Sequence, residues 1–187
     1  IQNGTLAREK FKYYIIQDYL YLEEYAKVFA IGIAKAKRLD TMRLFSRQVN
    51  FLTEGEMDIH RGYMGAFTVS QEELAATPRA LDNLSYTSYM LRVAYEEGEA
   101  EILAAILSCA YSYEVIAKTI LKNNPSASEH PFYGNWIKGY AGPEFCDGNV
   151  VLLDTLNHLT SRYTEEQLRH LTDIFLACSR YELAFWE

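Results

Sequence analysis

Asp18 is the first residue whose type and position could do chemistry. It lies in the middle of an apolar and aromatic stripe, whose members are three or four residues apart and therefore share one face of a helix. The stripe consists of Phe11, Tyr14, Ile15, Asp18, Tyr21, Leu22 and Tyr25. A buried carboxylate needs a hydrogen-bonding partner or it becomes protonated. Asp18 is therefore either a structural aspartate bonded to a neighbouring tyrosine or arginine, or a group that binds a ligand.

A second carboxylate, Glu182, repeats this pattern near the end of the chain. It is the only charged residue in a stripe formed by Leu171, Phe175, Cys178, Glu182 and Phe185. A glutamate on an apolar helix face is a candidate for a raised pKa and for acid/base catalysis. Because the burial of this face is inferred from the pattern alone, a structural role stays open.

Cys109 is the third candidate. It lies in a stretch, residues 104–115, that carries no charge before Glu114, and Tyr113 follows four residues later on the same helical face. A buried cysteine in such a stretch is ordinarily an inert thiol. A reactive thiol would need a group that stabilises the thiolate, and none of the four histidines is close in sequence. Both interpretations of Cys109 stay open at this point.

The remaining cysteine and histidine patterns do not predict a metal site. Cys109, Cys146 and Cys178 are far apart and form no C-x-x-C motif, so neither a zinc site nor a thioredoxin-type motif is expected. Free thiols fit a reducing cytosol, and we expect a cytoplasmic protein. The Glu-x-x-His motif of helical di-iron proteins is absent. Three acid–histidine pairs occur at spacing i, i+4 and are interpreted as exposed helix pairs: Glu56/His60, Asp154/His158 and Glu166/His170. A single haem-ligating histidine stays open.

The elements that must position these residues are helices nearly throughout. Helical periodicity dominates, and no segment shows sustained β alternation. Helices are expected over about residues 6–37, 41–64, 85–97, 99–122, 131–140, 143–161 and 164–186, with a short helix opened by the capping box at Ser70. The 187 residues are therefore expected to form one all-α domain, a multi-helix bundle larger than a minimal four-helix bundle.

Charge and composition narrow the class of partner. The net charge is −7, and the densest basic stretch, residues 35–47, has the spacing of a solvated helix face. Nucleic acids and anionic membranes are therefore not expected as partners, and no apolar run approaches the length of a membrane span. The composition is unusual in having 15 tyrosines against nine phenylalanines. Each buried tyrosine hydroxyl needs a partner, so this excess suggests more than packing.

Five segments, taken together, resemble the motifs of the TenA family, the thiaminase II aminopyrimidine hydrolases. Residues 11–22, FKYYIIQDYLYL, resemble the family pattern F-x-x-Y-x-x-Q-D-x-x-Y-L. The other four segments, in family order, are SYTSYM at 85–90, AEILAAILSC at 100–109, PFYGNWIKGY at 131–140 and YELAFW at 181–186. The resemblance covers nearly the whole chain, and five motifs in the right order are far more specific than one short pattern.

This resemblance implies a haem-oxygenase-like helical fold without haem, and an assembly of four copies. It implies hydrolysis of aminomethylpyrimidine, a thiamine breakdown product, or of thiamine itself, to hydroxymethylpyrimidine for thiamine salvage. No cofactor or metal is implied. By position in the motifs, Cys109 would be the nucleophile and Glu182 the acid/base. The expected substrate-binding residues are Asp18, Tyr21, Tyr86, Tyr113, Tyr140 and Phe185.

The sequence differs from the family pattern at both termini, and two alternative functions stay open. Family members carry about twenty further residues before the position of Ile1 and a further helix after Trp186, so we expect that both termini of this sequence are trimmed. The presence of Cys109 fits the cysteine-containing branch of the family. The rival functions are a non-catalytic regulatory or pyrimidine-binding protein, and a haem or di-metal oxidase on the same fold.

Overall fold

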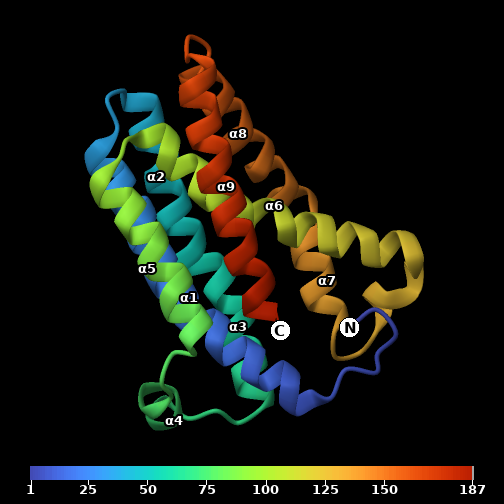
Figure 1. Ribbon diagram of the computed structural model, residues 1–187. Helices are drawn as coiled ribbons and strands as arrows, with labels where there is room; N and C mark the ends of the chain where they lie inside the picture. Colours follow the sequence, from blue (N-terminus) through green and yellow to red (C-terminus); the bar gives the residue numbers. More distant parts are fainter. Residues whose placement is uncertain (187) are drawn as a thin grey trace.

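A computed structural model describes residues 1–186, and of residues 55, 56 and 58 it describes the backbone alone. The described residues form helices and connecting turns without a strand, which confirms the all-α expectation (Figure 1). The elements are α1 (Arg8–Lys35), α2 (Leu39–Asn50), the π-helical turn η1 (Phe51–Glu56), α3 (Met57–Ala66), α4 (Gln71–Ala76), α5 (Leu81–Glu96), α6 (Glu99–Asn123), the 3₁₀ turn η2 (Pro125–Glu129), α7 (Gly134–Ala141), α8 (Pro143–Leu159) and α9 (Glu165–Trp186).

The single helix expected over residues 41–64 is wrong, because the chain passes there through η1 between α2 and α3. The Thr53 hydroxyl donates to the Val49 carbonyl four residues earlier, at 2.9 Å. Such back-bonding by threonine bends helices, and a π turn adds a residue to the local helical register. The face presented by α3 is therefore rotated relative to that of α2, and simple helical periodicity fails across the turn.

Helix α6 is the central element of the bundle. It packs against α9, α8, α7, α5 and α1, and Figure 1 shows it passing behind α9. By length and composition α6 could cross a membrane, so the expectation that no apolar run approaches such a span is wrong for this helix. However, 61% of its most apolar window is buried inside the bundle, as is usual for a core helix.

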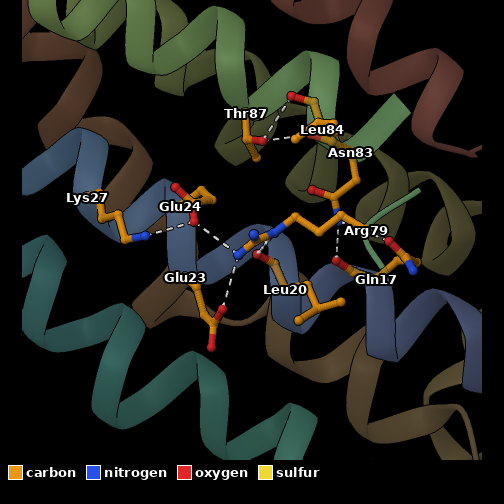
Figure 2. Close-up of polar contacts among 9 residues, drawn as sticks. All are labelled: Gln17, Leu20, Glu23, Glu24, Lys27, Arg79, Asn83, Leu84 and Thr87. Atoms are coloured by element: carbon orange, nitrogen blue, oxygen red, sulfur yellow. Dashed lines mark hydrogen bonds and ion pairs between the residues drawn. The ribbon is translucent and has the colours of Figure 1, made fainter. Parts of the chain in front are cut away.

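Helices α1 and α5 lie side by side and are fixed together by a polar cluster (Figure 2). The Gln17 side chain donates to the Pro78 carbonyl at 3.0 Å and accepts from the Ala80 N–H at 2.9 Å. Asn83 donates to the Gln17 carbonyl at 2.7 Å, and Arg79 reaches Glu24 at 3.0 Å. Because Gln17 and Asn83 are one and three residues from Asp18 and Tyr86, this cluster fixes the register between the two helices that carry those side chains.

The side-chain cap predicted at Ser70 is confirmed, and a second cap begins α9. The Ser70 hydroxyl accepts from the Glu73 N–H at 3.1 Å at the start of α4. At the start of α9, the Thr164 N–H donates to Gln167 at 2.9 Å, and the Gln167 N–H donates to the Thr164 hydroxyl at 3.3 Å. Reciprocal caps of this kind satisfy the first N–H groups of a helix, and here they set where α9 begins.

Candidate active site

Asp18 is buried and accepts hydrogen bonds from three side chains. The hydroxyl of Tyr14 lies 2.8 Å from Oδ2, and that of Tyr113 lies 3.1 Å from Oδ1. His60 Nε2 lies 2.7 Å from Oδ2. Trp136 Nε1 in turn donates to the Tyr14 hydroxyl at 3.0 Å. Since Oδ2 already has two partners and Oδ1 has one, the free accepting capacity of this carboxylate is on Oδ1.

The interpretation of His60 as half of an exposed helix pair is wrong. His60 is fully buried in α3 and bonds Asp18, whereas the side chain of Glu56 lies outside the described part of the chain. The π turn η1 rotates α3, so the imidazole faces the core. The available signal was apolar spacing, because Met57 and Met64 lie three residues before and four after His60 and are both buried. His158 and His170 are exposed, as expected, although His170 bonds Glu97 and not Glu166.

Glu182 is buried in α9. Burial is the largest cause that raises the pKa of its carboxyl group, the negative charge of Asp18 is the second, and the resulting pKa is about 8. Hydrogen bonds with Tyr86, Trp186 and Cys109 act in the opposite direction and only partly offset the burial. Trp186 Nε1 donates to Glu182 Oε1 at 3.2 Å. Glu182 is thus mostly protonated at neutral pH, a state in which it can give up a proton to a bound molecule.

Cys109 is buried in α6 and lies close enough to Glu182 to lower the pKa of that carboxyl group. A carboxyl group beside a cysteine can take up the thiol proton as the sulfur attacks. The sequence alone did not reveal such a partner for Cys109. Cys109 and Tyr113 also line a cavity of about 450 Å³, which runs between α1, α2, α6 and α8. Phe29, Phe51 and Phe145 contribute apolar walls to this cavity. The thiol is therefore both paired with an acid and adjacent to a space of small-molecule size.

Aromatic rings enclose the two carboxyl groups and the thiol. The Tyr21 ring centroid lies 5.3 Å from that of Tyr86 and 5.8 Å from that of Phe185. The Tyr113 ring centroid lies 4.6 Å from that of Tyr140. Burial raises the pKa values of Tyr21, Tyr86 and Tyr113 well above their ordinary value. These hydroxyls therefore keep their protons and act as hydrogen-bond donors.

The structure brings all the residues singled out from the sequence into one region. Five helices supply them, namely α1, α5, α6, α7 and α9, and the residues are Asp18, Tyr21, Tyr86, Cys109, Tyr113, Tyr140, Glu182 and Phe185. The sequence analysis did not select five further contributors, which are Tyr14, His60, Ser108, Trp136 and Trp186. Tyr14, Trp136 and Trp186 lay within the quoted motifs, so their aromatic type was the usable signal.

No metal-binding arrangement accompanies these residues. Among the described side chains, no group of three histidine, cysteine, aspartate or glutamate residues is placed to hold a metal ion. The pairing of a thiol with a protonated carboxyl group opposite a hydrogen-bonded carboxylate instead suits nucleophilic and acid/base chemistry on a flat, polar-edged ring.

Comparison with known proteins identifies consistent relatives. The model of the TENA/THI-4/PQQC family matches residues 1–187. A protein of Helicobacter pylori named aminopyrimidine aminohydrolase is 45% identical over 190 residues, which cover 100% of this chain and 86% of the relative. A protein of the same name from Halalkalibacterium halodurans is 42% identical over 187 residues, which cover 100% and 83%. The solved structure of a TenA homologue from P. horikoshii OT3 superposes with a TM-score of 0.87 at 29% identity, covering 99% of this chain and 84% of that one.

Proposed function

Since this chain belongs to the TENA/THI-4/PQQC family, we propose that it is an aminopyrimidine aminohydrolase of the thiaminase II type, acting in thiamine salvage. It hydrolyses aminomethylpyrimidine, thiamine or both, and releases 4-amino-5-hydroxymethyl-2-methylpyrimidine. The names of the relatives at 42–45% identity support this reaction. The observation that carries the mechanism is a buried Cys109 thiol that borders the cavity and lies close enough to Glu182, whose pKa is raised to about 8, to influence that pKa.

The reaction breaks the bond between a methylene carbon and a nitrogen, which water displaces only slowly. The Cys109 sulfur adds to a pyrimidine ring carbon, while a ring nitrogen takes up a proton. The electrons of the dearomatised ring then expel the leaving group, an amine or a thiazole, which departs with its bonding pair. Water adds to the exposed methylene carbon, and loss of the thiol restores the aromatic ring. Nucleophilic catalysis of this kind replaces one difficult step by several easier ones.

Glu182 transfers the protons in these reaction steps. A protonated carboxyl group can donate its proton to the ring nitrogen from one oxygen and accept the thiol proton on the other. The proton thus passes from Cys109 to the pyrimidine ring as the carbon–sulfur bond forms. Burial keeps Glu182 protonated at neutral pH, so the group is ready to donate when substrate binds.

Asp18 orients the pyrimidine. Its Oδ1 atom retains accepting capacity and binds the amino group on the ring edge, while Tyr113 and His60 hold the carboxylate in place. Tyr86 and Tyr140 supply further hydroxyl contacts, and the rings of Tyr21 and Phe185 form flat walls for a flat ring. Correct orientation of a bound reactant removes a large part of the entropic barrier to attack.

A turnover assay with aminomethylpyrimidine and thiamine side by side tests the proposed function. We expect release of hydroxymethylpyrimidine from at least one of the two. Absence of product from both substrates at several pH values between 6 and 9 would contradict the proposal.

Substitution of His60 tests whether Asp18 must be held for binding. In His60→Leu, Asp18 Oδ2 loses its 2.7 Å partner, so the carboxylate is held less firmly and KM is expected to rise about tenfold or more, in line with one lost buried charge-assisted hydrogen bond. In His60→Gln, the side-chain amide can still donate from nearly the same position, and most of the affinity should return. Steady-state kinetics of both variants, with circular dichroism to check folding, make the measurement. Equal KM values for the leucine variant and the wild type would show that His60 does not position Asp18.

We further infer that the protein assembles as a homotetramer in the cytoplasm. Cys146 and Cys178 are free thiols, which suits a reducing compartment. Large apolar side chains are exposed on the outward faces of α6 and α8, a feature typical of subunit interfaces. They are Tyr111, Val115, Val150, Val151 and Leu153. Light scattering after size exclusion should give four times the 21.5 kDa mass of the chain, and the mass of one chain would exclude the assembly.

A further inference from the structure

The cavity beside Cys109 adjoins the groups that hold the pyrimidine without containing them. Cys109 and Tyr113 are among its lining residues, whereas Asp18 and Glu182 are not. Tyr113 joins the two regions, because its side chain lines the cavity while its hydroxyl donates to Asp18 at 3.1 Å. The cavity therefore begins where the groups assigned to the edge of the pyrimidine end. No step of the reaction described above uses its volume of about 450 Å³.

Aromatic rings continue from the candidate active site into this cavity. Tyr25 lines the cavity and stacks on Tyr21 of the site, with 5.3 Å between the ring centroids. Phe29 extends this wall and lies edge to face with Tyr25 at 5.0 Å. On α8, Phe145 lines the cavity and lies edge to face with Tyr140 of the site, also at 5.0 Å. A flat ring next to the bound pyrimidine would therefore meet aromatic side chains from both α1 and α8.

The reaction itself directs the leaving group toward this space. Cys109 attacks a ring carbon adjacent to the one that carries the methylene, so that the ring electrons can expel the group attached there. The leaving group consequently lies next to the Cys109 sulfur, which borders the cavity. A volume of about 450 Å³ is within the range of about 300–1,000 Å³ that is usual for sites that enclose small organic molecules. A simple amine would leave most of it unfilled, whereas a second ring would use it.

The lining also suits a ring that carries a positive charge. Aromatic faces attract cations, and Phe51 and Phe145 contribute such faces to the lining. Glu144 and Asp147 add two carboxylates, and Arg47 adds one guanidinium group. The thiazolium of thiamine is a cation in the substrate and leaves as a neutral thiazole, because it takes the bonding pair. The cavity should accordingly hold the substrate more firmly than the departing product.

Gly148 keeps the α8 wall of the cavity open. It lies in the interior of α8 and lines the cavity one helical turn after Glu144. No atom lies within 4 Å of the position that a Cβ atom would take there, so packing does not require a glycine. Because glycine in a helix interior is destabilising relative to alanine, helix stability does not explain it either. The next residue, Asn149, holds this wall against α6 by donating to the Ala110 carbonyl at 2.9 Å.

We propose that this cavity is the subsite for the leaving group, and that Gly148 is a specificity-determining residue that leaves room for a flat heteroaromatic ring. The proposal rests on the proposed function, because it assigns a place to one product of that reaction. Contacts with the leaving group form before the bond breaks and contribute to substrate binding. Their loss should therefore appear in KM more than in kcat.

Larger side chains at position 148 test the subsite. Gly148→Leu and Gly148→Phe narrow the cavity from α8, and the Cβ atom itself meets open space. We expect KM for thiamine to rise about tenfold in the leucine variant and further in the phenylalanine variant, since the second ring loses its space. KM for aminomethylpyrimidine should change by less than about twofold, because its amine does not extend into the cavity. Steady-state kinetics with both substrates make the measurement.

Gly62 provides the matched controls. It is an exposed glycine of α3, and the position of its Cβ atom likewise has no atom within 4 Å. Gly62→Leu and Gly62→Phe introduce the same side chains outside the cavity, so the ratio of the two KM values should stay that of the wild type. Thermal unfolding of all four variants checks that each of them folds.

Isothermal titration gives a second readout, which needs no turnover. In a Cys109→Ala background, Gly148→Phe should weaken the binding of thiamine about tenfold and leave that of hydroxymethylpyrimidine, which lacks the second ring, nearly unaltered. Equal changes for the two ligands, or no change for either, would overturn the subsite. A wild type that hydrolyses aminomethylpyrimidine but neither hydrolyses nor binds thiamine would also overturn it and leave the proposed function intact. If the wild type hydrolyses neither substrate, the proposed function fails, and the titrations still decide whether the cavity holds the second ring.

Discussion

Replacement of Cys109 by alanine is expected to lower the rate of hydrolysis of aminomethylpyrimidine and thiamine at least about a hundredfold. The thiol is the group that adds to the ring, because it lines the 450 Å³ cavity and lies close enough to Glu182 to lower the pKa of that carboxyl group. Without this addition the ring keeps its aromatic electrons and cannot expel the leaving group. The loss should appear in kcat, whereas product binding, which depends on Asp18 and the aromatic walls, should change little.

Cys146 provides the matched control for this substitution. It is a half-buried free thiol at the start of α8, and its sulfur atom lies 3.7 Å from the Ala141 carbonyl. Cys146→Ala is expected to retain wild-type rates. Single-turnover kinetics with both substrates, together with isothermal titration of hydroxymethylpyrimidine into each variant, separate chemistry from binding. Full activity in Cys109→Ala would refute a cysteine nucleophile and would leave Glu182 as the group to re-examine.

The sequence predicted those site residues that lie on regular helices. Asp18, Glu182 and Cys109 were found because helical spacing places each on an apolar stripe, and tertiary burial followed the stripe. Spacing alone could not decide between a structural and a catalytic role. That decision needed distances between helices far apart in sequence, such as the 3.1 Å between Tyr113 and Asp18.

His60 shows where the same reasoning fails. Its helix follows the π turn η1, which changes the helical register, so extension of one periodic pattern across residues 41–64 misjudged its orientation. Ser108 shows a second kind of failure. Its hydroxyl meets Tyr86 from another helix, 22 residues away in sequence, and a lone serine on a buried helix has no pattern that would reveal such a contact.

The excess of tyrosine has two explanations in the structure. Tyr14 and Tyr113 donate hydrogen bonds to Asp18, and the Tyr86 hydroxyl bonds Ser108, so all three belong to the candidate site. Others bond main-chain carbonyls of distant segments and so tie elements together: Tyr25 to Ile106 at 2.8 Å, Tyr63 to Phe132 at 2.9 Å and Tyr133 to Leu6 at 2.5 Å. Phenylalanine would fill nearly the same volume but could not form these hydrogen bonds.

The second large effect is expected for Glu182→Gln, which should lower kcat at least about a hundredfold and leave KM nearly unchanged. Glutamine has nearly the same shape and can still accept a hydrogen bond from Trp186 Nε1, which lies 3.2 Å from Oε1 in the wild type. It cannot, however, hand a proton to the ring nitrogen or receive one from the thiol. The substitution therefore removes proton transfer while it preserves most of the binding surface. Glu96→Gln, at an exposed ion pair with Arg92, serves as the control and should be unaffected.

The pH dependence makes this prediction specific to Glu182. Because burial raises its pKa to about 8, the protonated and active form predominates below that pH and is lost as the pH rises through it. The wild-type kcat/KM should accordingly decline above about pH 8, in the direction opposite to the increase that titration of a free thiol to thiolate would give. The residual activity of Glu182→Gln should lack this decline. A decline at the same pH in the variant would assign the ionisation to another group, and unreduced activity would show that the ring is protonated by something other than Glu182.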